Sequence, residues 1–245
     1  MTATDAPAGE ATPERALVVV AHPDDIDFGM AGTVATLTAA GTTVSYCLVT
    51  SGEAGGDDRT LARSSMAALR QAEQTAAAAE VGVHDLRFLG FPDGAVVANL
   101  DLRKAIARVI RQVRPNRLFT QSPERNYERI HASHPDHLAV GQAAMNAVYP
   151  DARNPFAFPE LLDEGHGPWS VPEVWLAPPP GGPNRFVDIT GQFDQKVAAL
   201  LRHGSQIKHP DATREMMRTW AAANAEAAGL PEGRLAEGFR VVHTA

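Results

Sequence analysis

The chain has 245 residues, 44% of them hydrophobic, which is enough for one sizeable core, and its net charge is −7. With that charge and no cluster of Lys and Arg, the sequence argues against nucleic acid as a partner. The one cysteine, Cys47, lies in an apolar run, which excludes a disulfide framework and favours a reducing, cytoplasmic location. No apolar run reaches the roughly 20 residues of a membrane span, and residues 1–15 predict a flexible tail without a signal peptide.

Short apolar runs alternate with helical patterns through the first 150 residues. We expect strands at residues 16–21, 43–50, 86–90 and 117–121, and helices at 29–41, 59–82, 100–115 and from 135 onward. A continuous apolar run such as ALVVVA is typical of a strand buried on both faces. The alternation predicts a Rossmann-like α/β fold, in which a parallel sheet carries helices on both faces.

The alternation loosens after about residue 150. Here we expect strands at 173–178 and 185–190, helices at 191–207 and 211–229, and a short strand near 239–243. Because the sequence gives no sign of a second compact core, we predict one domain over residues 16–245, with a small C-terminal elaboration from about residue 151.

The triplet His-Pro-Asp occurs three times, and two of the copies come after predicted strands. The first copy, His22–Asp24, directly follows the first strand, and the second, His134–Asp136, comes after the fourth. Ligands bind beyond the carboxyl ends of the strands in open α/β sheets, and strands one and four commonly lie side by side. We therefore expect these two copies to face each other. The third copy, His209–Asp211, follows a helix and predicts only the start of the next one.

The first two copies supply imidazole and carboxylate groups that suit a catalytic zinc ion. Such a site uses three His, Asp or Glu ligands, keeps one position open, and has a free carboxylate nearby as general base. His22, His137 and one of the two adjacent aspartates, Asp24 and Asp25, fit the ligand set, and the other aspartate fits the base. The spacing alone does not decide between the two aspartates. A single copy could instead cap a helix, with its aspartate bonded to first-turn amides.

Five motifs together resemble the LmbE-like, or PIG-L, zinc-dependent de-N-acetylases. They are AHPDD (21–25), SGEAGG (51–56), RQAE (70–73), FLGFPDG (88–94) and HPDH (134–137). The resemblance covers roughly residues 16–207, and the pair AHPDD and HPDH is its most specific part. It implies a hydrolase that removes an N-acyl group from a small polar substrate, such as an N-acetyl amino sugar or its conjugate.

The resemblance also implies a role for the residue at each matching position. The ligands of Zn²⁺ would be His22, Asp25 and His137. Asp24 would be the general base, and His134 would stabilise the oxyanion or donate a proton. The substrate contacts would be Arg70, Asp93 and, as a weaker match, Glu53.

Other readings of these residues stay open. Many family members, among them those of the mycothiol pathway, have Glu directly after the two aspartates, whereas this chain has Ile26 and then Asp27, so the chain is not assigned to that pathway. An amidase of a thiol conjugate or of a natural-product intermediate, with the same site, is an alternative. Asp25 and Asp27 also resemble the Asp-x-Asp of magnesium-dependent phosphohydrolases, although magnesium prefers oxygen ligands over histidine. A non-catalytic sugar-binding module would be expected to lack a ligand or the base.

Three further features of the chain each have two possible interpretations. His203, near the end of a predicted helix, is expected either to interact with that helix terminus or to lie at the rim of the pocket. The loop residues Arg125, Asn126 and Tyr127 either line the pocket or are solvated. The sequence does not reveal the oligomeric state, which leaves a homo-oligomer open.

Overall fold

The computed structural model describes residues 12–56, 60–177 and 180–244. Of the tail expected at residues 1–15, the first 11 residues lie outside the described part, and a strand already begins at Arg15. The strands are β1 (Arg15–Val20), β2 (Thr43–Leu48), β3 (Asp85–Phe88), β4 (Arg117–Gln121), β5 (Glu173–Ala177), β6 (Arg185–Asp188) and β7 (Ala236–His243).

Eight α-helices and three further helical turns connect the described strands. The α-helices are α1 (Asp25–Gly29), α2 (Ala31–Ala39), α3 (Arg63–Glu80), α4 (Leu100–Val113), α5 (Pro135–Asn146), α6 (Glu160–Asp163), α7 (Phe193–Leu200) and α8 (Pro210–Ala227). The further turns are η1 (Ile130–Ser133), η2 (Ala147–Asp151) and η3 (Thr190–Gln192). None of the described helices is long and apolar enough to cross a membrane.

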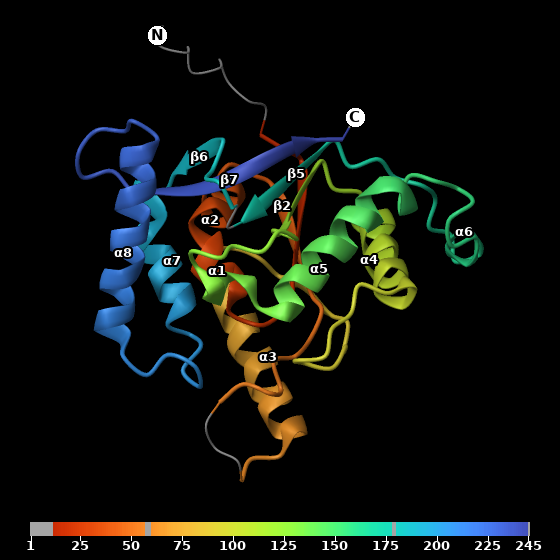
Figure 1. Ribbon diagram of the computed structural model, residues 1–245, viewed down its shortest axis with the longest axis horizontal. Helices are drawn as coiled ribbons and strands as arrows, with labels where there is room; N and C mark the ends of the chain where they lie inside the picture. Colours follow the sequence, from red (N-terminus) through yellow and green to blue (C-terminus); the bar gives the residue numbers. More distant parts are fainter. Residues whose placement is uncertain (1–11, 57–59, 178–179, 245) are drawn as a thin grey trace, which may run out of the picture.

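The seven strands form one sheet in the order β3-β2-β1-β4-β5-β7-β6 (Figure 1). The first five strands in this order are parallel, which confirms the predicted fold class. The strand order reverses between β1 and β4, which lie side by side as expected. The last strand, β7, is antiparallel to both β5 and β6, so the C-terminal segment extends the sheet with pairings that the sequence did not predict.

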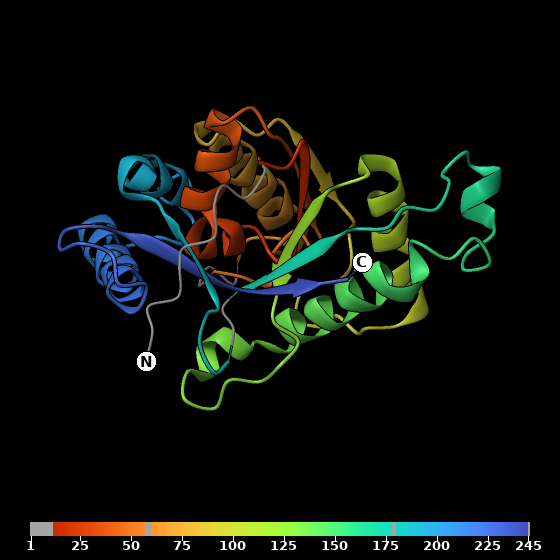
Figure 2. The same cartoon turned by 90° about the horizontal axis from the view of Figure 1, so that it is seen from above.

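Both faces of the sheet are buried under helices (Figure 2). In β1, Leu17 and Val19 pack on one face with residues of α4 and α5, while Val18 and Val20 pack on the other face with residues of α2 and α3. Successive side chains of a strand point to opposite faces, so a strand between two helical layers is apolar at every position. The continuous apolar run of β1 is therefore explained by its central place in the sheet.

The helix expected at residues 29–41 is instead two helices. Met30, with φ −150°, separates α1 from α2, and α1 already begins at Asp25. Asp24 directly precedes it with φ 86°, in the left-handed region. The sharp turn between β1 and α1 is what turns the first His-Pro-Asp triplet toward the edge of the sheet. The third triplet does start a helix, since Pro210 is the first residue of α8.

Candidate active site

Residues from four segments meet at the carboxyl edge of the central strands. His22 follows β1, and the first turn of α5 carries His137 beside it. The loop after β3 contributes Asp93, and α3 contributes Arg70. The first two His-Pro-Asp copies thus face each other across the β1–β4 pair, as the sequence predicts.

Three side chains converge with the spacing of metal ligands. His22 Nδ1 lies 3.4 Å from Asp25 Oδ2 and 3.3 Å from His137 Nε2, and His137 Nε2 lies 3.0 Å from Asp25 Oδ1. Zinc–ligand bonds of about 2.0–2.2 Å in a tetrahedral site place ligand atoms about 3.3–3.6 Å apart. The three side chains therefore fit a small divalent cation bound between them. His134 belongs to the same cluster, because ring nitrogens of His22, His134 and His137 lie within 4.8 Å of one another.

The other ring nitrogen of His22 is held by two carboxylates. His22 Nε2 lies 3.1 Å from Asp93 Oδ1 and 3.2 Å from Asp136 Oδ2. Asp136 in turn accepts hydrogen bonds from the amides of Gly94 and Val96, so it joins α5 to the loop after β3. Metal-binding histidines usually donate their second nitrogen to such a carboxylate, which fixes the ring. Sequence reasoning missed this role of Asp136, although its place between His134 and His137 was a signal.

The electrostatics also favour a positive charge at this point. Burial lowers the pKa of His22, but the carboxylates of Asp25 and Asp93 outweigh burial and raise that pKa to about 11. Burial raises the pKa of Asp25, yet His137 and His22 hold it well below its ordinary value. The buried carboxylates favour a positive charge beside them. A bound cation would supply that charge, and the imidazoles could then stay neutral and coordinate it.

Asp24 lies beside this cluster in a constrained backbone conformation. Its φ of 86° lies in the left-handed region, which a non-glycine residue rarely adopts. The amide of Asp24 donates to Gln74 Oε1 at 2.9 Å, and Arg70 Nη2 donates to Asp24 Oδ2 at 3.1 Å. Burial, together with the Asp25 carboxylate, raises the pKa of Asp24 to about 7 against the opposing charge of Arg70. A carboxyl group with that pKa gains and loses a proton near neutrality.

Arg70 is a buried side chain, with 4% of its surface exposed. Besides Asp24, its guanidinium donates to the carbonyl oxygens of Gly52 and Pro23. A Cβ at Gly52 would lie 2.3 Å from Arg70 Nη1, and Gly52 also has φ +68°, so only glycine fits there. The arginine therefore joins α3 to the loops after β1 and β2, and it still lines the cavity above the cluster.

Asp27 turns away from the cluster and into the protein. His203 Nε2 lies 2.8 Å from Asp27 Oδ2, and Gln74 Nε2 donates to the same oxygen at 2.9 Å. Both Asp27 and His203 are fully buried, so His203 does not lie at the rim of the pocket. Because Asp27 Oδ2 is held by these partners, the arrangement speaks against Asp25 and Asp27 acting as the acid pair of a phosphohydrolase.

Among the described residues, His134 has a hydrogen-bond partner at one ring nitrogen, Nδ1. The amide of Asp136 donates to His134 Nδ1 at 3.2 Å, which leaves the proton of a neutral ring on Nε2. Burial, with the neighbouring rings of His22 and His137, lowers the pKa of His134. The ring is therefore a neutral hydrogen-bond donor at physiological pH.

A polar cavity of about 410 Å³ opens above the cluster. Among its lining residues are His22, Asp24, Asp25, Arg70, Asp93, His134 and His137. Glu53 does not line it, and its carboxylate instead accepts from the Asp93 amide at 2.9 Å. The cavity brings together every residue that the sequence predicts for this site except Glu53, which braces the loop of Asp93.

Residues 17–148 match the family model described as "PIG-L: GlcNAc-PI de-N-acetylase". The chain is 32% identical over 230 residues to the diacetylchitobiose deacetylase of Thermococcus kodakarensis, covering 94% of this chain and 83% of that one. It is 30% identical over 247 residues to the 1D-myo-inositol 2-acetamido-2-deoxy-alpha-D-glucopyranoside deacetylase of Rhodococcus erythropolis, covering 80% and 82%. The solved structure of N,N'-diacetylchitobiose deacetylase from Pyrococcus horikoshii is similar with a TM-score of 0.86 and 30% identity, covering 94% of this chain and 84% of that one. With its paired His-Pro-Asp motifs on this fold, the chain belongs to the PIG-L family.

Proposed function

We propose that this protein is a zinc-dependent de-N-acylase acting on an N-acyl amino sugar or its conjugate. The observation that carries the proposal is the triangle of His22, Asp25 and His137, with the carboxylate of Asp24 beside it. The relatives named as deacetylases of acetamido sugars support the same chemistry. Cytoplasmic location and self-association stay predictions from the sequence.

His22, Asp25 and His137 would hold the metal ion, with Asp93 and Asp136 orienting His22. A bound zinc ion lowers the pKa of water and polarises an amide carbonyl. A nitrogen and oxygen donor set of this kind suits zinc better than magnesium, which prefers oxygen ligands alone.

Asp24 would be the general base. Its pKa of about 7 lets it take a proton from the attacking water and return it to the departing amine. Arg70 and the amide contact with Gln74 would fix its position, since both hold Asp24 directly. In this assignment Arg70 is a positioning residue, and a direct contact with the substrate is a further role that its place in the cavity wall permits.

His134 would donate a hydrogen bond from Nε2 to the carbonyl oxygen as negative charge develops there. The amide of Asp136 donates to Nδ1, so the single proton of the neutral ring lies on Nε2. This arrangement favours a hydrogen bond from Nε2 over transfer of a proton to the amine. Asp93 would accept from a substrate hydroxyl in the polar cavity, and Glu53 would act on the substrate only through the Asp93 loop. A thiol conjugate or a natural-product intermediate that carries an amino sugar would use the same residues.

The proposal is tested by following release of primary amine from N-acetylglucosamine and diacetylchitobiose by zinc-loaded protein. Asp24→Asn is expected to keep its zinc and to lose about 10²- to 10⁴-fold in kcat, the usual contribution of a general base. Asp85→Asn removes a carboxylate that pairs with Arg87 on β3, away from the site, and serves as control. Full activity of Asp24→Asn would overturn the assigned base. A metal-free protein that needs magnesium and releases phosphate from esters would overturn the function.

A further inference from the structure

A second and larger cavity adjoins the metal-ligand cluster. It has a volume of about 880 Å³, against about 410 Å³ for the polar cavity. Asp25, Phe28 and His137 line both cavities, so the two meet at the cluster. A bond cleaved at the cluster therefore has a small polar space on one side and a large space on the other.

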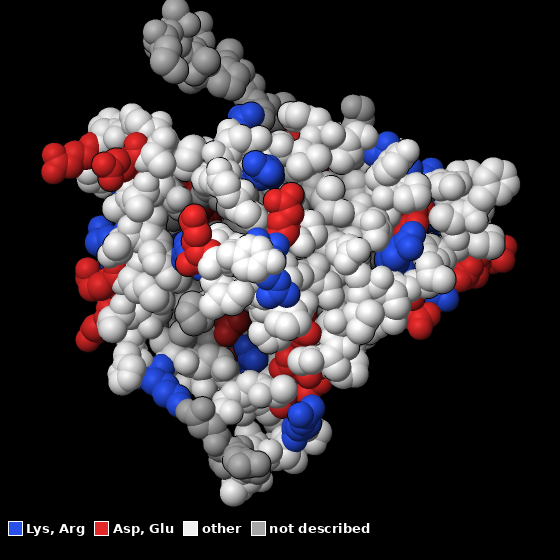
Figure 3. Space-filling view, in the orientation of Figure 1, with Lys and Arg blue, Asp and Glu red and all other residues white. Residues whose placement is uncertain are grey.

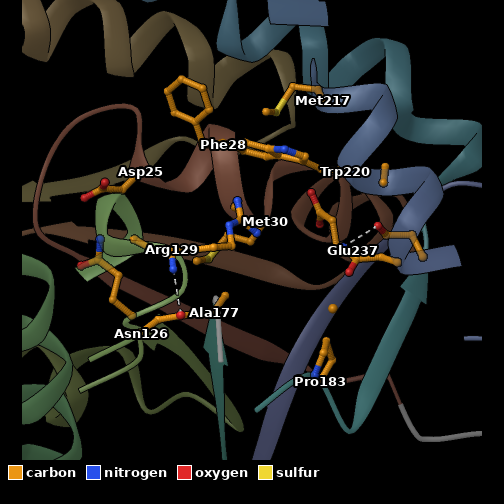
Figure 4. A pocket seen from close by; sticks show the side chains of 18 of the residues that line it. Asp25, Phe28, Met30, Asn126, Arg129, Ala177, Pro183, Met217, Trp220 and Glu237 are labelled. Atoms are coloured by element: carbon orange, nitrogen blue, oxygen red, sulfur yellow. Dashed lines mark hydrogen bonds between the residues drawn. The ribbon is translucent and has the colours of Figure 1, made fainter. Parts of the chain in front are cut away.

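The large cavity has an apolar wall. Phe28 and Met30 come from the α1–α2 region, and Met217 and Trp220 come from α8 (Figure 4). Figure 4 shows Phe28, Met217 and Trp220 along one side and Asp25 at one end. Trp220 is 40% exposed, so an indole in the cavity wall has open apolar surface. Aromatic and sulfur-containing side chains in a concave site are typical of a ligand with an apolar body.

The buried charges in this wall are already satisfied within the protein. Lys196 Nζ pairs with Glu237 Oε1 at 2.7 Å and donates to the carbonyl oxygens of Asp27 and Phe28. Arg129, an exposed residue, places its guanidinium over the Trp220 ring, 4.9 Å from the ring centre. On the face shown in Figure 3, charged side chains stand as separate groups between wide uncharged areas. Because the buried charges of Lys196 and Glu237 neutralise each other, the wall favours an uncharged ligand group over a phosphate or a carboxylate.

The size of the cavity also decides against a small occupant. A water molecule takes about 30 Å³ of liquid volume, and a methyl group is of comparable size, so the acetyl methyl would leave most of this space empty. Clefts of about 300–1,000 Å³ bind ligands of drug size. The polar cavity is suited to the sugar ring, so a further part of the substrate would occupy the large one.

We propose that the cavity lined by Phe28, Met30, Met217 and Trp220 binds an uncharged apolar group that the substrate carries in addition to its amino-sugar ring. This inference rests on the proposed de-N-acylase function and specifies its substrate class. The apolar group is either the N-acyl chain itself, longer than acetyl, or an aglycone on the sugar. Both sources share the same chemistry, and both would reach the cavity from a bond held at the cluster.

The test compares kcat/KM for three sets of substrates with zinc-loaded protein. The first is free N-acetylglucosamine, the second is glucosamine with N-acyl chains of two to eight carbons, and the third is N-acetylglucosamine with alkyl or aryl aglycones. Each buried methylene is worth about fourfold in affinity, so a chain that enters the cavity raises kcat/KM at least about tenfold over the minimal sugar. A rise with acyl length assigns the cavity to the acyl chain, and a rise with the aglycone assigns it to the aglycone.

Two variants and one control connect the preference to the cavity. Trp220→Ala and Met216→Glu change side chains that line the cavity and are 40% and 37% exposed, so both substitutions are tolerated by the helix. Each is expected to lower the ratio of kcat/KM for the apolar substrate to that for N-acetylglucosamine at least about fivefold. The control is Phe156→Ala, which removes a ring that is 89% exposed and does not line the cavity. This variant should leave the ratio of the two kcat/KM values unchanged.

The outcomes distinguish a failure of the proposed de-N-acylase function from a failure of the cavity assignment. Amine release from no N-acyl sugar would overturn the proposed function itself. Release from N-acetylglucosamine with no gain from any apolar group would overturn only this inference. An equal loss of preference in the Phe156→Ala control would likewise refute the assignment to the cavity.

Discussion

The buried ion pair of Lys196 and Glu237 supports the segment that carries Asp25. Glu237 accepts from the amides of Gly32 and Thr33 at the start of α2, and Lys196 donates to carbonyl oxygens of α1. Amides at a helix start have no partner within the helix, and here a side chain of β7 satisfies them. The pair therefore fixes both helices that follow the first His-Pro-Asp triplet.

Lys196→Met keeps most of the side-chain volume and removes the charge. Glu237 is only 4% exposed, so its carboxylate would then be buried without a cation beside it. Breaking such a buried pair costs about 3–5 kcal/mol of unfolding free energy. At about 2–4 °C per kcal/mol for a chain of this size, the melting temperature should fall by roughly 6–20 °C.

The control is a second ion pair with the same nitrogen–oxygen distance, in which both side chains are partly exposed to solvent. Arg108 and Glu164 also lie 2.7 Å apart, but their side chains are 35% and 40% exposed. Exposed pairs contribute about 0–1 kcal/mol, so Arg108→Met should shift the melting temperature by no more than a few degrees. Thermal unfolding followed by circular dichroism measures both variants. If Lys196→Met is no more harmful than Arg108→Met, the reasoning from burial is refuted.

Three further predictions concern packing and metal binding. Gly141→Ala would place a Cβ 2.3 Å from the backbone oxygen of Gln121, so α5 must move from β4, and urea unfolding should show a loss of about 1–3 kcal/mol or more. Tyr46→Phe removes a buried hydroxyl that has no hydrogen-bond partner among the described residues, and thermal unfolding should show no loss of stability. Added zinc at about 100 times its dissociation constant should stabilise the protein by about 2.7 kcal/mol, and chelator or His22→Ala should abolish the gain. An unchanged melting curve on adding zinc to wild type would contradict the ligand assignment.

Local patterns were enough to predict most of the fold and the centre of the site. The apolar run before His22 and the helix start at Pro135 predict where the two motifs lie, because a strand end and a helix start are encoded in neighbouring residues. The paired motifs also predict that His22 and His137 meet. These are the parts of the molecule in which sequence neighbours decide the structure.

The residues around that centre could not be predicted in the same way. Asp136 orients His22, and His203 contacts Asp27, across more than 100 positions of the chain. Such contacts depend on how helices dock onto the sheet, which no short pattern encodes. Of the two places left open for His203, the pocket rim is excluded, because its ring is fully buried and contacts Asp27 of α1.

The place of β7 in the sheet has a consequence for synthesis. β6 is made about 50 residues before β7, yet in the described sheet it pairs only with β7, which lies between β5 and β6. On the ribosome, β1 to β5 can therefore assemble while β6, Lys196 and the start of α2 still await their partners. The start of α2, which follows the segment that carries Asp25, is braced only once Glu237, 205 positions after Gly32, has been translated.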